Sequence, residues 1–389
     1  MSEMSYLEKL LDGVEVEWLP LGEITKYEQP TKYLVKAKDY HDTYTIPVLT
    51  AGKTFILGYT NETHGIYQAS KAPVIIFDDF TTANKWVDFD FKAKSSAMKM
   101  VTSCDDNKTL LKYVYYWLNT LPSEFAEGDH KRQWISNYSQ KKIPIPCPDN
   151  PEKSLAIQSE IVRILDKFTA LTAELTAELT AELNIRKKQY NYYRDKLLSF
   201  EEGEVEWKML GDLGENLDSK RKPITSGLRE AGSIPYYGAS GIVDYVKDYI
   251  FDGDFLLISE DGANLLARNT PIAFSISGKS WVNNHAHVIK FDSYAERRYV
   301  EYYLNSIDLA PYISGAAQPK LNKKNLESIR IPNPSPEDKE RIVSILDKFD
   351  ALTNSITEGL PREIELRQKQ YEYYRDLLFS FPKPETASN

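Results

Sequence analysis

The stretch QSEIVRILDKFTALTAELTAELTAELNIRKKQYNYYRDKLLSF, residues 158–200, decides the fold of this chain. Its middle repeats Thr-Ala-Glu-Leu at 172–175, 176–179 and 180–183, and no glycine or proline interrupts the stretch. Alanine, leucine, glutamate, lysine, glutamine and arginine dominate it, and all of them favour helix. The composition therefore predicts one long helix, rising about 1.5 Å per residue.

Both ends of this helix recur near the C-terminus. Ile164–Phe168 (ILDKF) returns as Ile345–Phe349, and Arg186–Phe200 returns, at the same offset, as RQKQYEYYRDLLFSF at 367–381. Two motifs repeated at one offset indicate an internal duplication. The second copy contains Pro361 where the first has unbroken helix, which predicts a kink or a restart.

The duplication extends into the segments between the helices. Glu17-Trp18 with Leu21-Gly22, for example, matches Glu206-Trp207 with Leu210-Gly211. Each half is therefore predicted to be a globular domain followed by a helix, with boundaries at 1–150, 151–202, 203–336 and 337–389. The predicted fold class is α+β: two mixed α/β domains, joined and separated by two long antiparallel helices that form a coiled coil, with a pseudo-twofold internal repeat.

The N-terminus resembles the end of the repeated helix. Tyr6–Leu11, followed by Gly13, matches Tyr193–Leu198 followed by Gly203. This arrangement predicts that the two termini lie close together.

Within the globular parts, short β-type runs such as 73–77 and 97–101 are predicted to precede helices over 109–121 and 296–307. Polar segments over 127–139 and 314–324 are predicted to be matching loops.

Composition limits the function classes. The net charge of −9 disfavours nucleic-acid binding when taken alone, although the globular parts contain basic clusters. No apolar run of membrane-spanning length occurs, and two cysteines are too few for a disulfide framework. A cytoplasmic location is the expectation.

None of the candidate catalytic and metal motifs is complete. Gly52-Lys53-Thr54 lacks the preceding glycine of a P-loop. His285 and His287 could bind a metal, but structural or DNA-facing histidines fit the sequence better, because no cysteine or carboxylate stands at ligand spacing. The adjacent acids 78–79, 105–106 and 260–261 are expected to be turn residues. The sequence thus predicts a chain that is non-catalytic by itself and binds no metal.

The duplicated helices with their TAEL repeats resemble those of the DNA-specificity (S) subunits of type I restriction–modification enzymes, most closely the type IC group. The segments IPYYGASG at 234–241, WVNNHAH at 281–287 and QPKLN at 318–322 are also similar to that family. The resemblance covers nearly the whole chain.

This resemblance implies that each globular domain recognises one half of a bipartite, asymmetric target in double-stranded DNA. It implies docking of two methyltransferase (M) subunits, which carry S-adenosylmethionine and methylate adenine. It also implies two restriction (R) subunits, with ATP and Mg on these partners and no cofactor bound by the chain itself.

Residues that suit DNA contact are basic groups for phosphate and amides or arginine for base edges. The candidates are Lys53, Lys131, Arg132, Gln133, Asn137, Arg221, Arg268, Asn284, His285, Gln318, Lys320 and Asn322. For any single one, a solvated surface role is the simpler alternative.

The helices supply two further sets of candidates. Aromatic and arginine residues, which are enriched at interfaces, are predicted to dock M subunits, with plain coiled-coil packing as the alternative: Tyr190, Tyr193, Arg194, Tyr371, Tyr374 and Arg375. The TAEL repeats, marked by Leu175, Leu179 and Leu183, are predicted to set the spacer between the two half-sites.

Two other classes of function remain alternatives. The chain could be a coiled-coil scaffold with two domains that bind sugars or peptides, which its acidic charge favours. It could also be a self-contained nuclease or methyltransferase, which the missing motifs disfavour.

Overall fold

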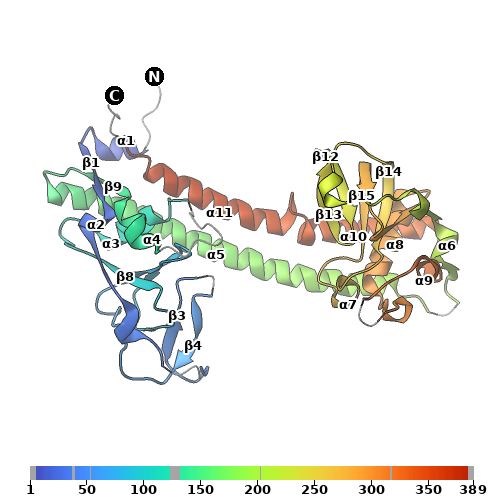
Figure 1. Cartoon of the computed structure of the whole chain (residues 1–389), viewed down its shortest axis with the longest axis horizontal. Helices are drawn as coiled ribbons and strands as arrows, with labels where there is room; N and C mark the ends of the chain where they lie inside the picture. The colour runs from blue at the N-terminus through green and yellow to red at the C-terminus, as the bar shows by residue number, and fades with distance from the viewer. Residues whose placement is uncertain are drawn as a thin grey trace. The chain divides into compact units, whose positions relative to one another are not determined.

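The computed structural model describes residues 6–36, 40–52, 54–122, 132–201, 203–315 and 318–383. The chain divides into two compact units (Figure 1). The first unit comprises Met1–Glu178 and Ile364–Asn389, and the second comprises Leu179–Glu363. The boundary falls inside the TAEL repeats, so the long helix contributes to both units. The four domain boundaries given above stay a prediction.

The long helix is confirmed as α5, Pro151–Leu198, with 48 residues. In the first unit, Ile157, Ile161 and Leu165 of α5 are buried in the main core. The TAEL leucines Leu175 and Leu179 are only partly buried. The apolar stripe of α5 is therefore used fully against the globular part and less fully in the repeats.

In its described residues the first unit contains three small sheets besides the N-terminal part of α5. Their strand orders are β1-β9, β2-β8-β5-β6 and β4-β3-β7. Its strands are β1 (Val16–Pro20), β2 (Thr25–Glu28), β3 (Ile46–Leu49), β4 (Ile56–Thr60), β5 (Val74–Asp78), β6 (Asn84–Val87), β7 (Lys92–Ala93), β8 (Met98–Ser103) and β9 (Lys142–Pro146). Its shorter helices are α1 (Tyr6–Leu11), α2 (Leu21–Ile24), α3 (Leu111–Leu118) and α4 (Gln133–Ser136).

The second unit has a two-stranded sheet, β10-β17, and a six-stranded sheet ordered β11-β16-β14-β15-β12-β13. Its strands are β10 (Glu206–Met209), β11 (Glu215–Asn216), β12 (Ala231–Gly238), β13 (Gly241–Val246), β14 (Phe251–Ser259), β15 (Ala273–Val282), β16 (Ala286–Lys290) and β17 (Arg330–Asn333). Its shorter helices are α6 (Leu210–Leu213), α7 (Asn264–Ala267), α8 (Tyr294–Ser306) and α9 (Lys323–Glu327).

The duplication is visible in the strand pairing of the two units. β1 pairs with β9 in the first unit, and Trp18 lies opposite Pro144. β10 pairs with β17 in the second unit, and Trp207 lies opposite Pro332. Each unit therefore closes the entry and the exit of its globular part with the same antiparallel ladder.

The repeated ILDKF motif anchors each globular part to its long helix. In the first unit the Tyr116 hydroxyl donates to Asp166 at 2.5 Å. In the second unit the Tyr302 hydroxyl donates to Asp347 at 2.6 Å. The aspartate of the motif thus has the same role in both units.

The second long helix is two helices, α10 (Pro336–Asn354) and α11 (Gly359–Leu378). The restart expected at Pro361 is confirmed, but the break lies before it, at 355–358. Gly359 adopts a φ of +76°. A Cβ there would lie 2.3 Å from the carbonyl oxygen of Ala351, so only glycine fits.

We therefore expect Gly359→Ala to lower the free energy of unfolding of the second unit by at least about 2 kcal/mol, because it adds left-handed strain to a backbone clash. Chemical denaturation of the full chain measures the change. Gly227→Ala is the matched control, since nothing lies within 4 Å of a Cβ at Gly227. Equal stability of the two variants would contradict the prediction.

The first and last described segments of the chain lie together in the first unit, in line with the prediction; the terminal residues themselves lie outside the described part. Leu7 and Leu11 of α1 share a core with Leu378 and Phe379 at the end of α11. The Trp18 indole donates to the Pro382 carbonyl at 2.9 Å. Figure 1 shows α1 beside the end of α11.

Helix packing in each unit pairs α5 with the second helical segment. In the first unit Phe168 stacks on Tyr374, with ring centroids 5.4 Å apart. In the second unit Tyr193 stacks on Phe349 at 5.6 Å. The expected α+β fold with two long helices is confirmed, apart from the break between α10 and α11.

Candidate nucleic-acid interface

In the first unit, the segment that carries most of the candidate DNA contacts is held in place by two buried aromatic side chains. Residues 127–139 were expected to form a polar loop, and for the described part this was wrong. Trp134 of α4 and Tyr138 are 2% exposed. Both pack on Phe77 of β5, with ring centroids 5.0 and 4.9 Å away. Two aromatic side chains therefore fix this segment against the sheet.

Asp79, directly after β5, holds the same segment by its backbone and its side chain. Its carbonyl oxygen accepts from the Gln133 amide at 2.8 Å. Its carboxylate accepts from the Trp134 amide at 3.0 Å and lies 3.5 Å from Arg132. The Lys99 ammonium is 3.0 Å away, and both side chains of this pair are fully buried. Asp79 lies in the turn after β5, as predicted, and its side chain also holds the segment that carries Arg132.

The candidate contacts of the first unit differ in accessibility. Arg132 is exposed, whereas the side chain of Gln133 is 9% exposed. The amide of Asn137 donates to Gln133 at 3.4 Å. Lys53 and Lys131 lie outside the described residues. Arg132 is thus the candidate best placed for a phosphate, and Gln133 is turned into the structure.

The second unit contains a carboxylate with a corresponding role. Glu260, directly after β14, lies 2.6 Å from Arg221 and 3.1 Å from Lys320. Its carbonyl oxygen accepts from the Leu321 amide at 2.7 Å. Burial raises the pKa of Glu260, but Arg221, His287 and Lys320 together hold it below its ordinary value. Glu260 was predicted to be a turn residue, but it lies between β14 and an isolated bridge at Asp261 rather than in a turn.

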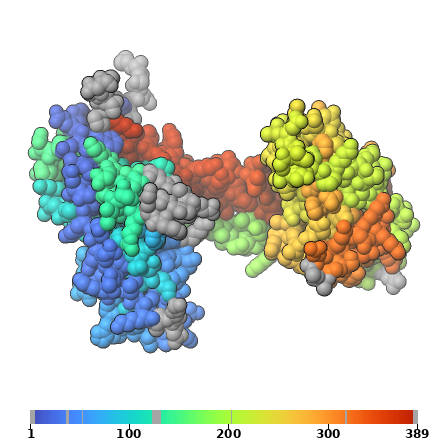
Figure 2. Space-filling view, in the orientation of Figure 1, coloured from blue at the N-terminus to red at the C-terminus, as the bar shows by residue number. Residues whose placement is uncertain are grey.

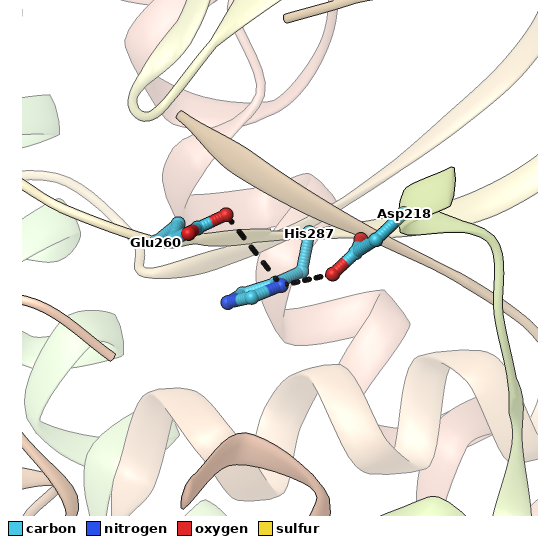
Figure 3. Close-up of side chains that lie close together, drawn as sticks. All are labelled: Asp218, Glu260 and His287. Atoms are coloured by element: carbon cyan, nitrogen blue, oxygen red, sulfur yellow. Dashed lines mark hydrogen bonds and ion pairs between the residues drawn. The ribbon is translucent and has the colours of Figure 1, made fainter. Parts of the chain in front are cut away.

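His287 joins this cluster from β16 (Figure 3). Its Nδ1 lies 2.6 Å from Asp218, and its Nε2 lies 2.7 Å from the Leu321 carbonyl. Burial raises the pKa of Asp218, and the hydrogen bond and charge of His287 lower it below the ordinary value. The carboxylates expected to be lacking near the histidines are thus present, supplied by segments remote in the sequence.

Asp218, Glu260 and His287 bring their ligand atoms close enough for a metal ion. The surrounding geometry opposes that role. Both ring nitrogens of His287 already lie within hydrogen-bond distance of an oxygen, of Asp218 or of the Leu321 carbonyl, so a metal ion at either nitrogen would have to displace that contact. The Arg221 guanidinium already pairs with both carboxylates. The cluster is a structural network that ties residue 321 to the sheet.

The remaining candidates of the second unit fall into two groups. Asn284, His285 and Gln318 are exposed. Arg268 instead donates to the Ile307 carbonyl at 2.7 Å, and the Asn322 side chain caps α9 by accepting from the Asn325 amide. Arg221 is committed to the carboxylate network. The exposed group, with Lys320, is the better placed for DNA.

The helical candidates pack across the helix pair and keep part of their surface exposed. Tyr371 accepts a hydrogen bond from Thr169 at 3.2 Å, and Tyr190 contacts Phe349. Arg194 and Arg375 each pair with the next aspartate in sequence. Tyr192 and Tyr373, which belong to the same aromatic clusters and were predicted to dock partners with them, are more open, at 60% and 64% exposed. The view of Figure 2 shows the surface of α11 in red.

The sequence analysis did not identify Asp79 or Glu260 as partners of the candidate DNA contacts. An available indication was their common position directly after apolar strands, in VIIFDD at 74–79 and LLISED at 256–261. Their partners could not be found that way, because Lys99, Arg132, Arg221 and Lys320 come from other elements.

Comparison with known proteins identifies the class. Residues 13–184 and 202–366 match the family described as the type I restriction modification DNA specificity domain. The chain belongs to this family and is a specificity subunit of a type I restriction–modification system. The predicted assignment to a non-catalytic subunit is confirmed on this basis.

Particular relatives agree with this assignment. The chain is 68% identical to the EcoR124I/EcoR124II specificity subunit of Escherichia coli, covering all of both chains. It is 39% identical to the EcoprrI specificity subunit of Escherichia coli, over 92% of this chain and 93% of the relative.

Solved structures share the fold. A type I S subunit from M. genitalium aligns over 98% of this chain and all of its own, with a TM-score of 0.53 and 15% identity. A structure described as showing complex assembly and conformational transition of the type I system covers 94% of this chain and 97% of its own, with a TM-score of 0.57 and 15% identity.

In the described part of the chain, no helix combines the length and the apolar character that crossing a bilayer requires.

Proposed function

We propose that each unit recognises one half of a bipartite, asymmetric DNA target, and that the long helices set the spacing and dock two methyltransferase subunits. The duplication carries this proposal. In each unit a basic residue, Arg132 or Lys320, pairs with the acidic residue that directly follows an inner strand, while the sequences around the two basic residues differ. Two units with the same ion-pair arrangement but different surrounding sequences are suited to recognise two different half-sites. Restriction subunits would join the same assembly.

The cofactors of the reaction are assigned to the partners. S-adenosylmethionine would be bound by the methyltransferase subunits, and ATP and Mg by the restriction subunits. The residues of this chain would bind and orient the DNA.

The test is to sequence methylated adenines in cells that carry this chain with its methyltransferase subunit. A split target with two unlike half-sites and an unread spacer is expected. A continuous target, or methylation without sequence preference, would overturn the proposal and favour a scaffold with another ligand.

Gln318→Ala is expected to weaken discrimination at one half-site by about 1–3 kcal/mol, if its exposed amide makes a bidentate base contact. Competition binding with DNA altered in either half-site measures the change, and the other half-site is the internal control. Gln133→Ala was predicted to act in the same way on the first half-site. Because Gln133 is buried, Gln318 is the sharper test. Unchanged discrimination in Gln318→Ala would contradict the base contact.

Tyr373→Ala is expected to weaken assembly with the methyltransferase subunit by about 2 kcal/mol, since exposed aromatic residues often dominate interface energies. Titration of the purified subunits measures the affinity. Stability should stay unchanged, because the ring is 64% exposed. Tyr374→Ala is the comparison, since that ring stacks on Phe168 and its loss also weakens helix packing. Full affinity in Tyr373→Ala would remove this ring from the docking surface.

A further inference from the structure

Two adjacent acidic residues lie at or directly after the ends of β5 and β14, and only one of each pair is buried. Asp79 is fully buried and Glu260 is 8% exposed. Asp78 instead stabilises its own turn, accepting from the amides of Phe80 and Thr81. The carboxylates of Asp79 and Glu260 instead contact cations on other elements, Lys99 and Arg221.

Backbone hydrogen bonds show that Asp79 and Glu260 occupy equivalent positions. The carbonyl of Asp79 accepts from the amide of Gln133, and that of Glu260 accepts from the amide of Leu321. Each bond joins the end of a central strand to the loop that bears the candidate DNA contacts. The residue before each bonded amide is basic: Arg132 in one unit and Lys320 in the other.

A second pair of contacts confirms the register. The amide of Leu21 donates to the Lys141 carbonyl, and the amide of Leu210 donates to the Ile329 carbonyl, both at 2.9 Å. Lys141 follows Gln133 by 141 − 133 = 8 positions, and Ile329 follows Leu321 by 329 − 321 = 8 positions. The two loops therefore return to the fold over equal lengths, although their sequences differ.

The side chains repeat the same arrangement. Asp79 pairs with an internal cation, Lys99, and with the loop cation Arg132. Glu260 pairs with the internal cation Arg221 and with the loop cation Lys320. Each carboxylate thus connects a cation inside its unit with the basic residue at the start of the segment that carries the candidate DNA contacts.

The loop cations keep a surface for another partner. The side chains of Arg132 and Lys320 are 50% and 51% exposed. A guanidinium or ammonium group has more donors than one carboxylate contact uses, and phosphate oxygens are the acceptors that such groups bind on DNA. The carboxylate restricts the side chain on one side and leaves the other open.

We infer that Asp79 and Glu260 are equivalent positioning residues, which hold Arg132 and Lys320 where each contacts a phosphate of its own half-site. This inference rests on the proposed function. The carboxylates themselves do not touch DNA. They remove the rotamer freedom that a long cation otherwise loses on binding, and they fix the start of the segment that follows, which contains α4 in the first unit and α9 in the second.

The test uses the full chain assembled with its methyltransferase subunits and a duplex that carries the target. Glu260→Gln is expected to weaken binding about tenfold, the size of one charge-assisted contact. The loss should be similar on target and unrelated DNA, because a phosphate contact carries no sequence information, and the salt dependence of binding should fall. Assembly with the methyltransferase subunits should stay the same, which a general loss of folding would not produce.

A double-mutant cycle separates positioning from mere stability. In a Lys320→Gln background, Glu260→Gln should cost less than about twofold, because the cation that it positions is already gone. Asp254→Asn is the matched control: it removes a carboxylate from β14 that is 61% exposed and pairs with Arg297. Asp79→Asn, with Asp78→Asn as its control, should repeat the pattern at the first half-site.

An equal loss from Glu260→Gln with and without Lys320, or a loss that leaves the salt dependence of binding unchanged, would overturn the inference. If Glu260→Gln fails to assemble, Glu260→Asp is used instead, because it keeps the negative charge but shortens the side chain by one methylene. The same pattern is expected, with a smaller loss of binding. A wild-type complex that ignores changes in both half-sites would overturn the proposed function, and this inference with it.

Discussion

Deleting Thr176–Leu179 is expected to shorten the unread spacer of the DNA target by about one base pair and to leave both half-sites unchanged. Four helical residues add about 6 Å and a net turn of roughly 40°. One base pair adds about 3.4 Å and roughly 35°. One TAEL repeat therefore rotates the end of a helix about as far as one base pair rotates a half-site.

The measurement is methylated-adenine sequencing in cells that carry the shortened chain. Methylation of the original target should be lost, and a target with a shorter spacer should replace it. Replacing Thr176–Leu179 by four alanines is the control, because it keeps the helix length, and its spacer should stay the same. A deletion that alters a half-site, or leaves the spacer as it was, would end the proposal that the repeats set the spacing.

Arg298→Ala is expected to destabilise the second unit by about 3–5 kcal/mol, because it leaves the buried carboxylate of Glu301 without its cation. Arg298 lies 2.5 Å from Glu301, 3.0 Å from Asp347 and 3.1 Å from Asp350. Its side chain is 12% exposed. Denaturant unfolding of the full chain measures the loss.

Lys112→Ala is the matched control in the first unit. Lys112 pairs at 2.9 Å with Asp166, the aspartate of the first ILDKF motif, but the two side chains are 32% and 40% exposed. Solvent screens such a pair, so its loss should cost less than about 1 kcal/mol. Equal losses from the two substitutions would show that burial does not govern this contact.

The deficit of Arg298→Ala should also depend on pH. Burial raises the pKa of Glu301, and Arg298 opposes that rise. Without Arg298 the pKa of Glu301 in the folded state rises further. The loss of folding stability is therefore full at pH values above that pKa, and it becomes smaller as the pH falls and the carboxyl group takes up a proton. The variant should therefore lie closer to wild type near pH 5 than near pH 7. A deficit that grows on acidification would contradict this account.

The long helix, the duplication and the approach of the termini could be derived from the sequence because each rests on local composition or on repeated motifs. The break in the second helix was predicted from Pro361, but its position was not. The left-handed Gly359 sets it, because its close approach to Ala351 leaves no room for a side chain.

The candidate DNA contacts show the limit more sharply. Residue type alone made Gln133 and Arg132 equal candidates, yet one is buried and the other is half exposed. Only the approach of β5 to residues 132–138 decides this, because Trp134 and Tyr138 take the room around Phe77.

By itself the sequence determined the class of fold, the repeat and the family resemblance, since helix propensity and motif spacing are properties of the chain. The tertiary structure decided which charges work together. Asp79 with Arg132 and Glu260 with Lys320 are distant in sequence, and their pairing follows from hydrogen bonds that bring each loop back to the end of a central strand. Ion pairs act through distance and burial, which sequence spacing does not encode.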